Sequence, residues 1–285
     1  STPIKSSAAS DVYKRQSVDA VDQIRFSGQK QENWYIQTAK DAMAAGDMIY
    51  AGKYSKPDYE LLVSEGCDLA IENRMITHSP EVVEMLQSFD IPVMIEYSSY
   101  EQHPLGKVEW VKFFGALTGK EAEAEEAFAE QTEILEKVES GEKTGKTIAF
   151  FYVTSNGLIQ VRQSTDYIPK LIELAGGRYI FEDLEDSGSG RSTLNMQVED
   201  FYAGAKDADI LIYNSSIDGG VTTLDELIGK CNILKDFKAV QEGQVYCTTN
   251  DMYQQSMAIG YLLQDMHTVL TDDDTAKLRY LFLLQ

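Results

Sequence analysis

Short apolar runs alternate with helical patterns from residue 47 onward, and this alternation limits the fold more than any other feature of the sequence. Most of the runs are apolar at every position, which is typical of parallel strands covered on both faces. We expect strands at residues 47–51, 67–72, 91–97, 147–153, 208–214 and 244–248. Strand–helix–strand alternation at this spacing predicts an α/β fold with mostly parallel sheets.

Patterns typical of helices fill the spaces between these strands. We expect helices at residues 57–65, 80–89, 166–175, 224–228, 256–270 and 276–283. Gly66 follows the first of them and suits a helix C-terminus, because glycine adopts the left-handed backbone at little cost. Ser79 and Pro80 suit the start of the second, as its N-cap and first helical residue.

The middle of the chain departs from this alternation. Residues 105–117 place Val108, Val111 and Phe114 on one face of a helix. Residues 120–138 follow with many alanines and glutamates, which are good helix formers, and with no Gly or Pro. A long acidic helix between two α/β halves is typical of a rigid connector.

This layout divides the chain into four parts. Residues 1–16 read STPIKSSAASDVYKRQ and lack a hydrophobic period, so we expect a flexible leader or a sequence artefact there. Residues 17–118 then form an N-terminal lobe, residues 119–141 the connecting helix, and residues 142–285 a C-terminal lobe.

Charge and composition exclude several classes of protein. Lys and Arg number 25 against 46 Asp and Glu, a net charge of −21. Nucleic-acid binding depends on cations that displace counterions from phosphates, so we expect no nucleic-acid partner. No apolar run approaches the roughly 18 residues of a membrane-spanning helix. The three cysteines are widely spaced, which argues against a disulfide framework or a structural zinc site.

Signatures of catalysis are weak in this sequence. Residues 140–147, SGEKTGKT, nearly match a phosphate-binding loop, but they follow a helix and precede a strand, the reverse of the order in that motif. His78, His103 and His267 are too widely spaced to suggest a preformed metal site, and no G-x-S-x-G elbow occurs. We therefore expect no enzyme, no catalytic residue and no resident metal or cofactor.

Polar and aromatic side chains follow the ends of several predicted strands. In open α/β sheets, ligands bind outside the carboxyl ends of the strands. Aromatic rings beside arginines suit a flat or anionic organic ligand. The candidate ligand-binding residues are Arg74, Tyr97, Tyr100, His103, Arg162, Asn214 and Tyr253.

Three segments together resemble one known family. They are residues 67–125, with the runs S-P-E, D-I-P-V, P-L-G-K-V-E-W and G-K-E-A-E-A; residues 167–184, YIPKLIELAGGRYIFEDL; and residues 201–214, FYAGAKDADILIYN. In combination they resemble the solute-binding proteins of ABC importers for iron–siderophore complexes and vitamin B12. These are periplasmic binding proteins of type 2, class III, with a long-helix connector, and the resemblance covers roughly residues 18–285.

The resemblance implies two α/β lobes joined by a single long α-helix, with a ligand cleft between the lobes. It implies an extracytoplasmic protein, lipid-anchored at the cell surface or periplasmic, whose signal segment is not in this chain. Its ligand would be an iron chelate and its partner an ABC permease in the membrane, with the binding protein itself a monomer. Glu60 and Glu199 match the two glutamates by which such proteins dock arginines of the permease.

The sequence departs from the family pattern at its start. Family N-lobes have a further strand and helix before the region of residues 18–24, and we expect this N-lobe to lack them. Two other functions remain open. One is a haem or cobalamin binder of the same fold, with Met75, His78, His103 or Tyr253 as an axial ligand. The other is an α/β enzyme acting on a sugar or nucleotide.

Overall fold

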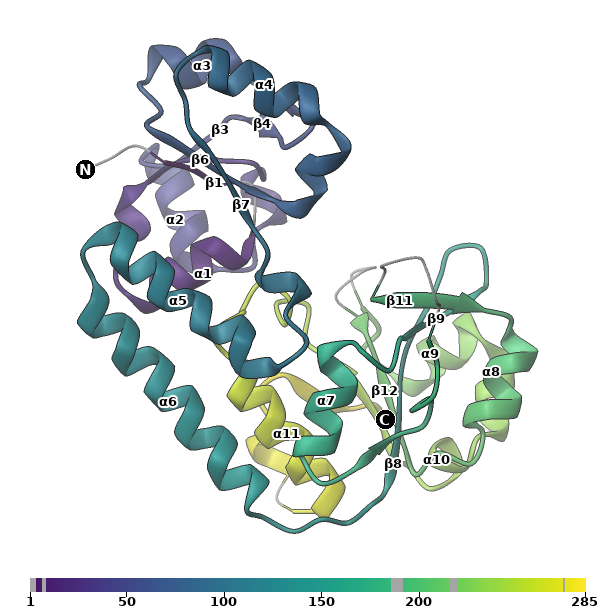
Figure 1. Ribbon diagram of the computed structural model, residues 1–285. Coiled ribbons are helices and arrows are strands. Elements are labelled where there is room, and N and C mark those ends of the chain that lie inside the picture. Colours follow the sequence, from purple (N-terminus) through teal and green to yellow (C-terminus); the bar gives the residue numbers. More distant parts are fainter. Residues whose placement is uncertain (1–3, 7–8, 186–191, 216–219, 274) are drawn as a thin grey trace. The chain divides into compact units, whose positions relative to one another are not determined.

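The computed structural model describes residues 4–6, 9–185, 192–215, 220–273 and 275–285 (Figure 1). Contacts group the chain into two compact units. Unit 1 comprises Ser1–Glu101, Gly106–Glu130 and Gln254–Met257, and unit 2 comprises Gln102–Leu105, Gln131–Tyr253 and Ala258–Gln285. Each unit has its own mostly parallel sheet, so the predicted two-lobe α/β fold is confirmed.

The sheet of unit 1 has five parallel strands in the order β3-β2-β1-β6-β7. They are β1 (Ile4–Ser6), β2 (Ile24–Ser27), β3 (Ile49–Tyr50), β6 (Leu69–Asn73) and β7 (Val93–Glu96). After β1, the chain adds β2 and then β3 on one side of that strand. It then crosses to the other side of β1, where it adds β6 and β7. The strand order therefore reverses between β1 and β6, and Arg74 follows β6 directly at this switch point.

Helices and short turns connect these strands. The helices are α1 (Ala9–Ser17), α2 (Gln37–Ala45), α3 (Tyr59–Ser64), α4 (Pro80–Ser88) and α5 (Pro104–Thr118). The 3-10 turns are η1 (Val21–Gln23), η2 (Gln31–Asn33), η3 (Arg74–His78) and η4 (Ser98–Tyr100), and β4 (Gly52–Lys53) pairs with β5 (Lys56–Pro57) in a small hairpin. Leu62 of α3, Leu86 of α4 and Ala70 of β6 are buried in one apolar cluster, so these two helices pack on the sheet.

The front of the chain corrects one prediction. Residues 1–16 were expected to be a flexible leader, with the first strand and helix of the N-lobe missing. Instead β1 lies inside the sheet between β2 and β6, and α1 follows it. Lys5 of β1 forms a buried ion pair with Glu72, and Val12 of α1 is buried among apolar side chains. The run is too short and polar to read as a strand from its sequence.

The sheet of unit 2 mixes parallel and antiparallel strands. Its order is β11-β9-β8-β12-β13-β14, with β10 also paired with β8. The strands are β8 (Thr147–Val153), β9 (Ile159–Arg162), β10 (Arg178–Tyr179), β11 (Thr193–Met196), β12 (Ile210–Tyr213), β13 (Val245–Thr248) and β14 (Leu281–Leu283). β8, β10, β12 and β13 run parallel, whereas β9, β11 and β14 pair antiparallel with their neighbours.

Helices of unit 2 surround an aromatic core. They are α7 (Tyr167–Leu174), α8 (Val198–Ala205), α9 (Leu224–Lys230), α10 (Lys238–Gln241) and α11 (Ile259–Thr271), with the turns η6 (Asn232–Asp236) and η7 (Thr275–Lys277). Phe201 of α8 lies with its ring centre 4.9 Å from that of Phe151 and 5.4 Å from that of Phe237. This cluster fixes α8, and with it Glu199, against the sheet.

The end of the chain corrects a second prediction. Residues 276–283 were expected to be a helix, but Leu281–Leu283 form β14, an edge strand antiparallel to β13. The buried Asp265 carboxylate of α11 accepts N–H groups from Arg279, Tyr280 and Leu281 at 2.9, 2.6 and 3.0 Å. Those three amides therefore cannot supply the hydrogen bonds that a helix would need at this point.

The long helix expected at residues 120–138 is α6 (Glu121–Glu139), and the division between the units falls inside it. Its first half packs on α5, where a Cβ at Gly115 would lie only 2.5 Å from the Cβ of Ala124. In its second half, the Oε1 atom of Gln131 accepts the N–H of Gly260 in α11 at 2.9 Å. No helix in the described ranges is both long and apolar enough to cross a membrane.

Candidate ligand-binding site

In unit 1, the candidate residues gather at the carboxyl ends of β6 and β7. Arg74 opens η3, and its guanidinium carbon lies 4.0 Å from the centre of the Tyr100 ring. Tyr97, Tyr100 and Met75 are all exposed beside it. A cation stacked on an exposed aromatic ring offers charge and a flat surface together. The structure thus brings Arg74 and Tyr100 into contact at the switch point of the sheet.

A buried polar network holds the loop that carries the two tyrosines. The carboxylate Oε1 of Glu96 accepts the N–H of Ser98 at 2.9 Å and lies 3.1 Å from Nζ of Lys14. Lys14 also donates to the Ser98 hydroxyl at 2.7 Å, and Lys107 of α5 donates to the Ser98 carbonyl at 3.0 Å. Buried, hydrogen-bonded groups of this kind fix the backbone of the loop around Ser98, from which the two exposed tyrosine rings extend.

His103 has a different position from the other candidates. Its Nδ1 atom accepts the N–H of Leu105 at 3.2 Å, which caps the first turn of α5. Contacts group Gln102–Leu105 with unit 2, whereas Arg74, Tyr97 and Tyr100 belong to unit 1. The described hydrogen bond of His103 is therefore structural, and its part in ligand binding stays a prediction.

In unit 2, Arg162, Asn214 and Tyr253 converge, although 91 residues separate the first from the last. The guanidinium carbon of Arg162 lies 5.4 Å from the centre of the Tyr253 ring and 5.7 Å from that of Phe150. The amide Nδ2 of Asn214 donates to the Tyr253 hydroxyl at 2.9 Å. The result is a cluster of one arginine, one amide and one phenol from three separate segments.

The strand that carries Arg162 runs in a direction that the sequence did not predict. We expected it to follow the carboxyl end of a parallel strand. Instead β9 returns antiparallel to β8 after a tight turn in which Gly157 has a φ of +80°. Thr154 and Leu158 close that turn by reciprocal hydrogen bonds. Arg162 therefore lies part-way back along β8, where its side chain still contacts the Tyr253 ring.

Neighbouring side chains hold Arg162 in place. Only 8% of the residue is exposed, and its Nη1 atom lies 3.6 Å from Oδ2 of Asp166, the N-cap of α7. The Tyr179 hydroxyl accepts the Arg162 N–H at 3.0 Å and donates to the Arg162 carbonyl at 2.8 Å. Burial raises the pKa of Tyr179 above its ordinary value, so the phenol stays protonated and can donate. Sequence reasoning missed Asp166 and Tyr179, although Asp166 is the first residue of a predicted helix and Tyr179 lies shortly after its end.

The two candidate docking glutamates lie on helix starts in different units. Glu60 is in the first turn of α3, whose N-cap Asp58 accepts the N–H of Leu61. Glu199 is in the first turn of α8, next to Asp200. Both glutamates are exposed. A carboxylate is favoured at either position by the helix dipole, and neither contributes to the two arginine–tyrosine clusters.

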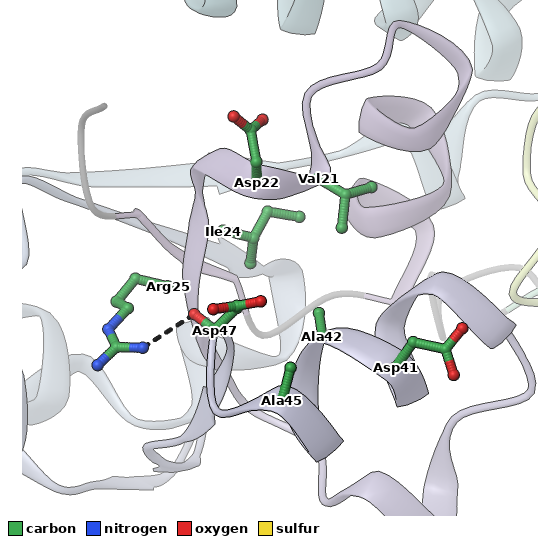
Figure 2. A pocket seen from close by; sticks show the side chains of 8 residues that line it. All are labelled: Val21, Asp22, Ile24, Arg25, Asp41, Ala42, Ala45 and Asp47. Atoms are coloured by element: carbon green, nitrogen blue, oxygen red, sulfur yellow. Dashed lines mark hydrogen bonds between the residues drawn. The ribbon is translucent and has the colours of Figure 1, made fainter.

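A recess of about 580 Å³ lies elsewhere in unit 1, between α2 and the start of β2 (Figure 2). Its lining includes the carboxylates of Asp22, Asp41 and Asp47. Arg25 donates to the backbone carbonyls of Gly46 and Asp47, and it pairs with Glu65. The recess lies at the amino end of β2, the edge of a parallel sheet opposite to the one where ligands bind. Among the described residues, no group of three or more His, Cys, Asp or Glu could hold a metal ion.

Comparison with known proteins identifies the family. The family model described as "Periplasmic binding protein" matches residues 30–252, which is most of the chain. The chain belongs to the periplasmic binding protein family. The resemblance inferred from the sequence motifs is thereby confirmed, and this is a family of binding proteins.

Two curated sequence relatives of this periplasmic binding protein are named as uncharacterized lipoproteins. The uncharacterized lipoprotein MJ0878 of Methanocaldococcus jannaschii is 27% identical over 252 residues, which is 85% of this chain and 57% of the relative. The uncharacterized lipoprotein MJ0872 of the same organism is 27% identical over 75% of this chain and 55% of the relative. The chain thus spans little more than half the length of these curated relatives.

Solved structures share the fold of this periplasmic binding protein. The periplasmic heme-binding protein HutB of Vibrio cholerae matches with a TM-score of 0.74 and 14% identity over 94% of this chain and 98% of that one. An ABC transporter substrate-binding protein of Listeria monocytogenes matches with 0.68 and 16%, over 96% and 100%. An ABC-type Fe3+-hydroxamate transport system from Saccharomonospora viridis matches with 0.66 and 16%, over 94% and 93%. At these identities the likeness establishes the fold alone.

Proposed function

We propose that this periplasmic binding protein captures a ferric chelate of the siderophore class outside the cytoplasm and delivers it to the permease of an ABC importer. The observation that carries the proposal is the pair of arginine–tyrosine clusters, one in each unit. Ferric siderophores present anionic oxygen donors around the iron, often on aromatic rings. Arginine offers a planar fork of donors to such oxygens, and tyrosine offers a ring to stack on.

The two clusters differ in how firmly their arginines are held. Arg162 is held by Asp166 and Tyr179, so its charge is already in place before the ligand arrives. Preorganisation of this kind lowers the entropic cost of binding. Arg74 and Tyr100 are more exposed and can adjust to ligands of different outline. The names of several fold neighbours, which mention heme and Fe3+-hydroxamate, support an iron chelate as the ligand class.

Titration with a panel of iron compounds tests this function. The panel comprises a ferric catecholate, a ferric hydroxamate, haem and cobalamin, with quenching of tryptophan and tyrosine fluorescence as the readout. We expect one ferric chelate to saturate the protein at sub-micromolar concentration, about −8 kcal/mol or stronger. Saturable binding by none of the four compounds would contradict the proposal, as would turnover of a sugar or nucleotide.

Haem is the second candidate ligand, because an exposed thioether and two exposed phenols lie beside Arg74. Met75, Tyr97 and Tyr100 could each supply an axial ligand to a haem iron. In that case haem addition gives a sharp Soret band. Tyr97→Phe or Tyr100→Phe would shift or remove the band, since phenylalanine lacks the ligating oxygen. A siderophore binder gives neither result.

Delivery to the importer would rest on Glu60 and Glu199. Both are exposed carboxylates at helix starts, away from the ligand clusters. They can pair with arginines of a permease without disturbing ligand binding. Membership of the periplasmic binding protein family and the lipoprotein names of the relatives support an extracytoplasmic location. We further propose that the protein acts as a monomer.

A further inference from the structure

Five arginines of this acidic protein fall into two groups by their partners. Arg25, Arg162 and Arg178 each have a guanidinium nitrogen close to a carboxylate oxygen, at 3.0, 3.6 and 3.5 Å. Arg74 and Arg279 have no carboxylate within ion-pair distance in the described part of the chain, and each lies over a tyrosine ring instead. The chain has 46 acidic residues, so an arginine without an acidic partner is notable. Arg74 belongs to the ligand-binding cluster of unit 1, whereas Arg279 belongs to neither cluster.

Arg279 stacks closely on Tyr261. Its guanidinium carbon lies 3.8 Å from the centre of the Tyr261 ring, compared with 5.4 Å between Arg162 and the Tyr253 ring. Arg279 is exposed, and Tyr261 is half-buried in the first turn of α11. A guanidinium that lies flat on a ring directs its N–H groups outward in its own plane, where they can meet an anion.

Hydrogen bonds of the main chain hold the segment that carries Arg279. The Asp265 carboxylate accepts the N–H of Arg279 at 2.9 Å and those of the next two residues. The N–H of Thr249 donates to the Tyr280 carbonyl at 2.9 Å. Because these bonds use backbone atoms of the segment, they remain when the side chain at position 279 is changed. Arg279 is therefore a cation at a fixed place, and its substitution leaves that place intact.

The place of Arg279 is the edge of the unit 2 sheet where the Arg162 cluster also lies. Leu281, the first residue of β14, pairs with Thr248, the last residue of β13. Arg279 therefore lies just beyond the carboxyl end of β13, from which the segment with Tyr253 also extends. Ligands bind at this edge of an α/β sheet. Neighbouring strands are about 4.8 Å apart, so β14 lies about 10 Å from β12, which leads into Asn214.

The charges around Arg279 leave its cation available to a ligand. Asp265 is close enough for the Arg279 charge to oppose the rise in the Asp265 pKa that burial causes, but three backbone N–H groups occupy its Oδ2 atom. Asp251 follows the same end of β13 and is not within ion-pair distance of Arg279. Asp272 lies at the opposite edge, where it pairs with the residue before β8. Lys277 adds an exposed cation two residues before Arg279.

We propose that Arg279 and Tyr261 form a subsite for a carboxylate that the chelate carries outside its iron-binding groups. This inference rests on the proposed function and narrows its ligand to chelates with a free carboxylate. The iron-binding groups lie at the Arg162 cluster, and the carboxylate reaches Arg279 at the same edge of the sheet. A carboxylate matches the planar fork of a guanidinium with two parallel hydrogen bonds. The Tyr261 ring keeps that fork in one orientation.

The test compares ferric chelates that differ in a single group. One pair is a linear ferric trihydroxamate that ends in a carboxylate, and the same compound with that carboxylate converted to a primary amide. A ferric tricatecholate with the same two end groups forms the second pair. The variant is Arg279→Gln, and the matched control is Arg178→Gln, which alters an exposed arginine of the same unit. Fluorescence titration at 0.1 M NaCl gives each affinity, and thermal unfolding establishes that each variant is folded.

We expect the wild type to bind the carboxylate form at least about tenfold more tightly than the amide form, for whichever iron-binding core it accepts. Arg279→Gln should bind the two forms within about twofold of each other and keep the wild-type affinity for the amide. Arg178→Gln should keep the full preference, because surface ion pairs contribute little. Tyr261→Phe, which retains a ring, should also keep the preference, whereas Tyr261→Leu should reduce it.

Four results would overturn the inference. Equal affinity of the wild type for both end groups would remove the subsite and leave the proposed function in place. Loss of the preference in Arg178→Gln as well would mean that net charge, and not Arg279, recognises the carboxylate. An equal loss of affinity for both forms in Arg279→Gln would give this arginine a purely structural role. Saturable binding of none of the four chelates would contradict the proposed function itself, and the subsite with it.

Discussion

Arg162 is the single residue on which ligand binding should depend most. It is a buried cation whose guanidinium contacts the Tyr253 ring and lies near Asp166. Arg162→Gln removes the charge and shortens the side chain but keeps it polar. We expect at least about tenfold weaker binding of a ferric chelate, since one lost charge-assisted contact is typically worth about 1.5–3 kcal/mol. Fluorescence titration of the purified variant measures this loss.

Arg178 offers a matched control for that substitution. It lies in the same unit, but its side chain is 58% exposed and pairs at the surface with Glu182 at 3.5 Å. Arg178→Gln should leave chelate affinity within about twofold, because surface ion pairs contribute little. Equal losses from both arginines would mean that net charge, and not the Arg162 cluster, determines affinity.

The sequence predicted which residues belong to the two arginine–tyrosine clusters. It did not predict which of them contact one another or which residues hold them in place. Arg74, Tyr100, Arg162, Asn214 and Tyr253 were all selected because they follow or lie near strand ends. That Arg74 stacks on Tyr100 could not be foreseen, because contact between residues 26 positions apart depends on how β6 and β7 pair. The residues that hold the clusters in place have no separate sequence signal, since a buried serine or tyrosine looks like any other.

At the scale of elements, the Asp209 carboxylate links the first residue of β8 to the first residue of α10 by hydrogen bonds. Its Oδ2 accepts the N–H and the hydroxyl of Thr147 at 2.7 and 2.9 Å, and its Oδ1 lies 2.6 Å from Nζ of Lys238. Burial alone would raise the pKa of Asp209. The hydrogen bonds from Lys238 and Thr147 outweigh it, so the pKa lies below its ordinary value of 3.8.

The sign of this pKa shift predicts acid sensitivity. A carboxyl with a depressed pKa in the folded state stabilises the fold above the unfolded pKa and loses that contribution as the pH falls through its folded pKa. Asp209→Asn should lower the free energy of unfolding at pH 7 by about 1–2 kcal/mol. The difference between variant and wild type should shrink below pH 3.8. Urea unfolding at pH 7 and pH 3 measures it, and a constant difference would contradict the assignment.

Gly176 lies at the junction between α7 and β10, at a position that has no room for a larger residue. Its φ is +96°, and a Cβ there would lie 2.5 Å from the Glu142 carbonyl oxygen. Gly176→Ala should therefore cost at least about 2 kcal/mol in the free energy of unfolding. Gly229→Ala is the control, because Gly229 lies in α9 with no atom near its Cβ position. Alanine there should stabilise the fold by about 0.5–1 kcal/mol. Equal effects in thermal unfolding would refute this account of the junction.

Long apolar strands were easier to predict than short or polar ones. All six predicted strands occur, and β8 (Thr147–Val153) has its predicted limits. The missed strands have two to four residues each, and several alternate apolar with polar side chains; they are β1, β2, β4, β5, β9, β10, β11 and β14. Whether such a short segment forms a strand depends on its pairing with a neighbouring strand. The helix wrongly predicted at residues 276–283 is an example. Its apolar pattern allowed either structure, and hydrogen bonds to Asp265 and to β13 selected the strand.

At the scale of the whole molecule, α6 limits how the protein can respond to its ligand. The helix has no Gly or Pro, and its halves are fixed by contacts with α5 and α11. A helix without such residues offers no natural hinge. We expect nearly the same radius of gyration for the free and the loaded protein in solution scattering. Glu133→Gly, an exposed substitution in α6, should increase the difference. A large compaction of the wild type would contradict a rigid connector.

Capture of the natural ligand tests the central claim most directly. The purified protein would be incubated with the organism's own spent, iron-limited medium, and retained compounds would be identified by mass spectrometry. The protein with Arg74→Gln and Arg162→Gln serves as the control, because it lacks both cluster arginines. Our account predicts that the wild type retains a ferric chelate that the double variant does not. Retention of no iron compound, or of the same chelate by both proteins, would contradict it.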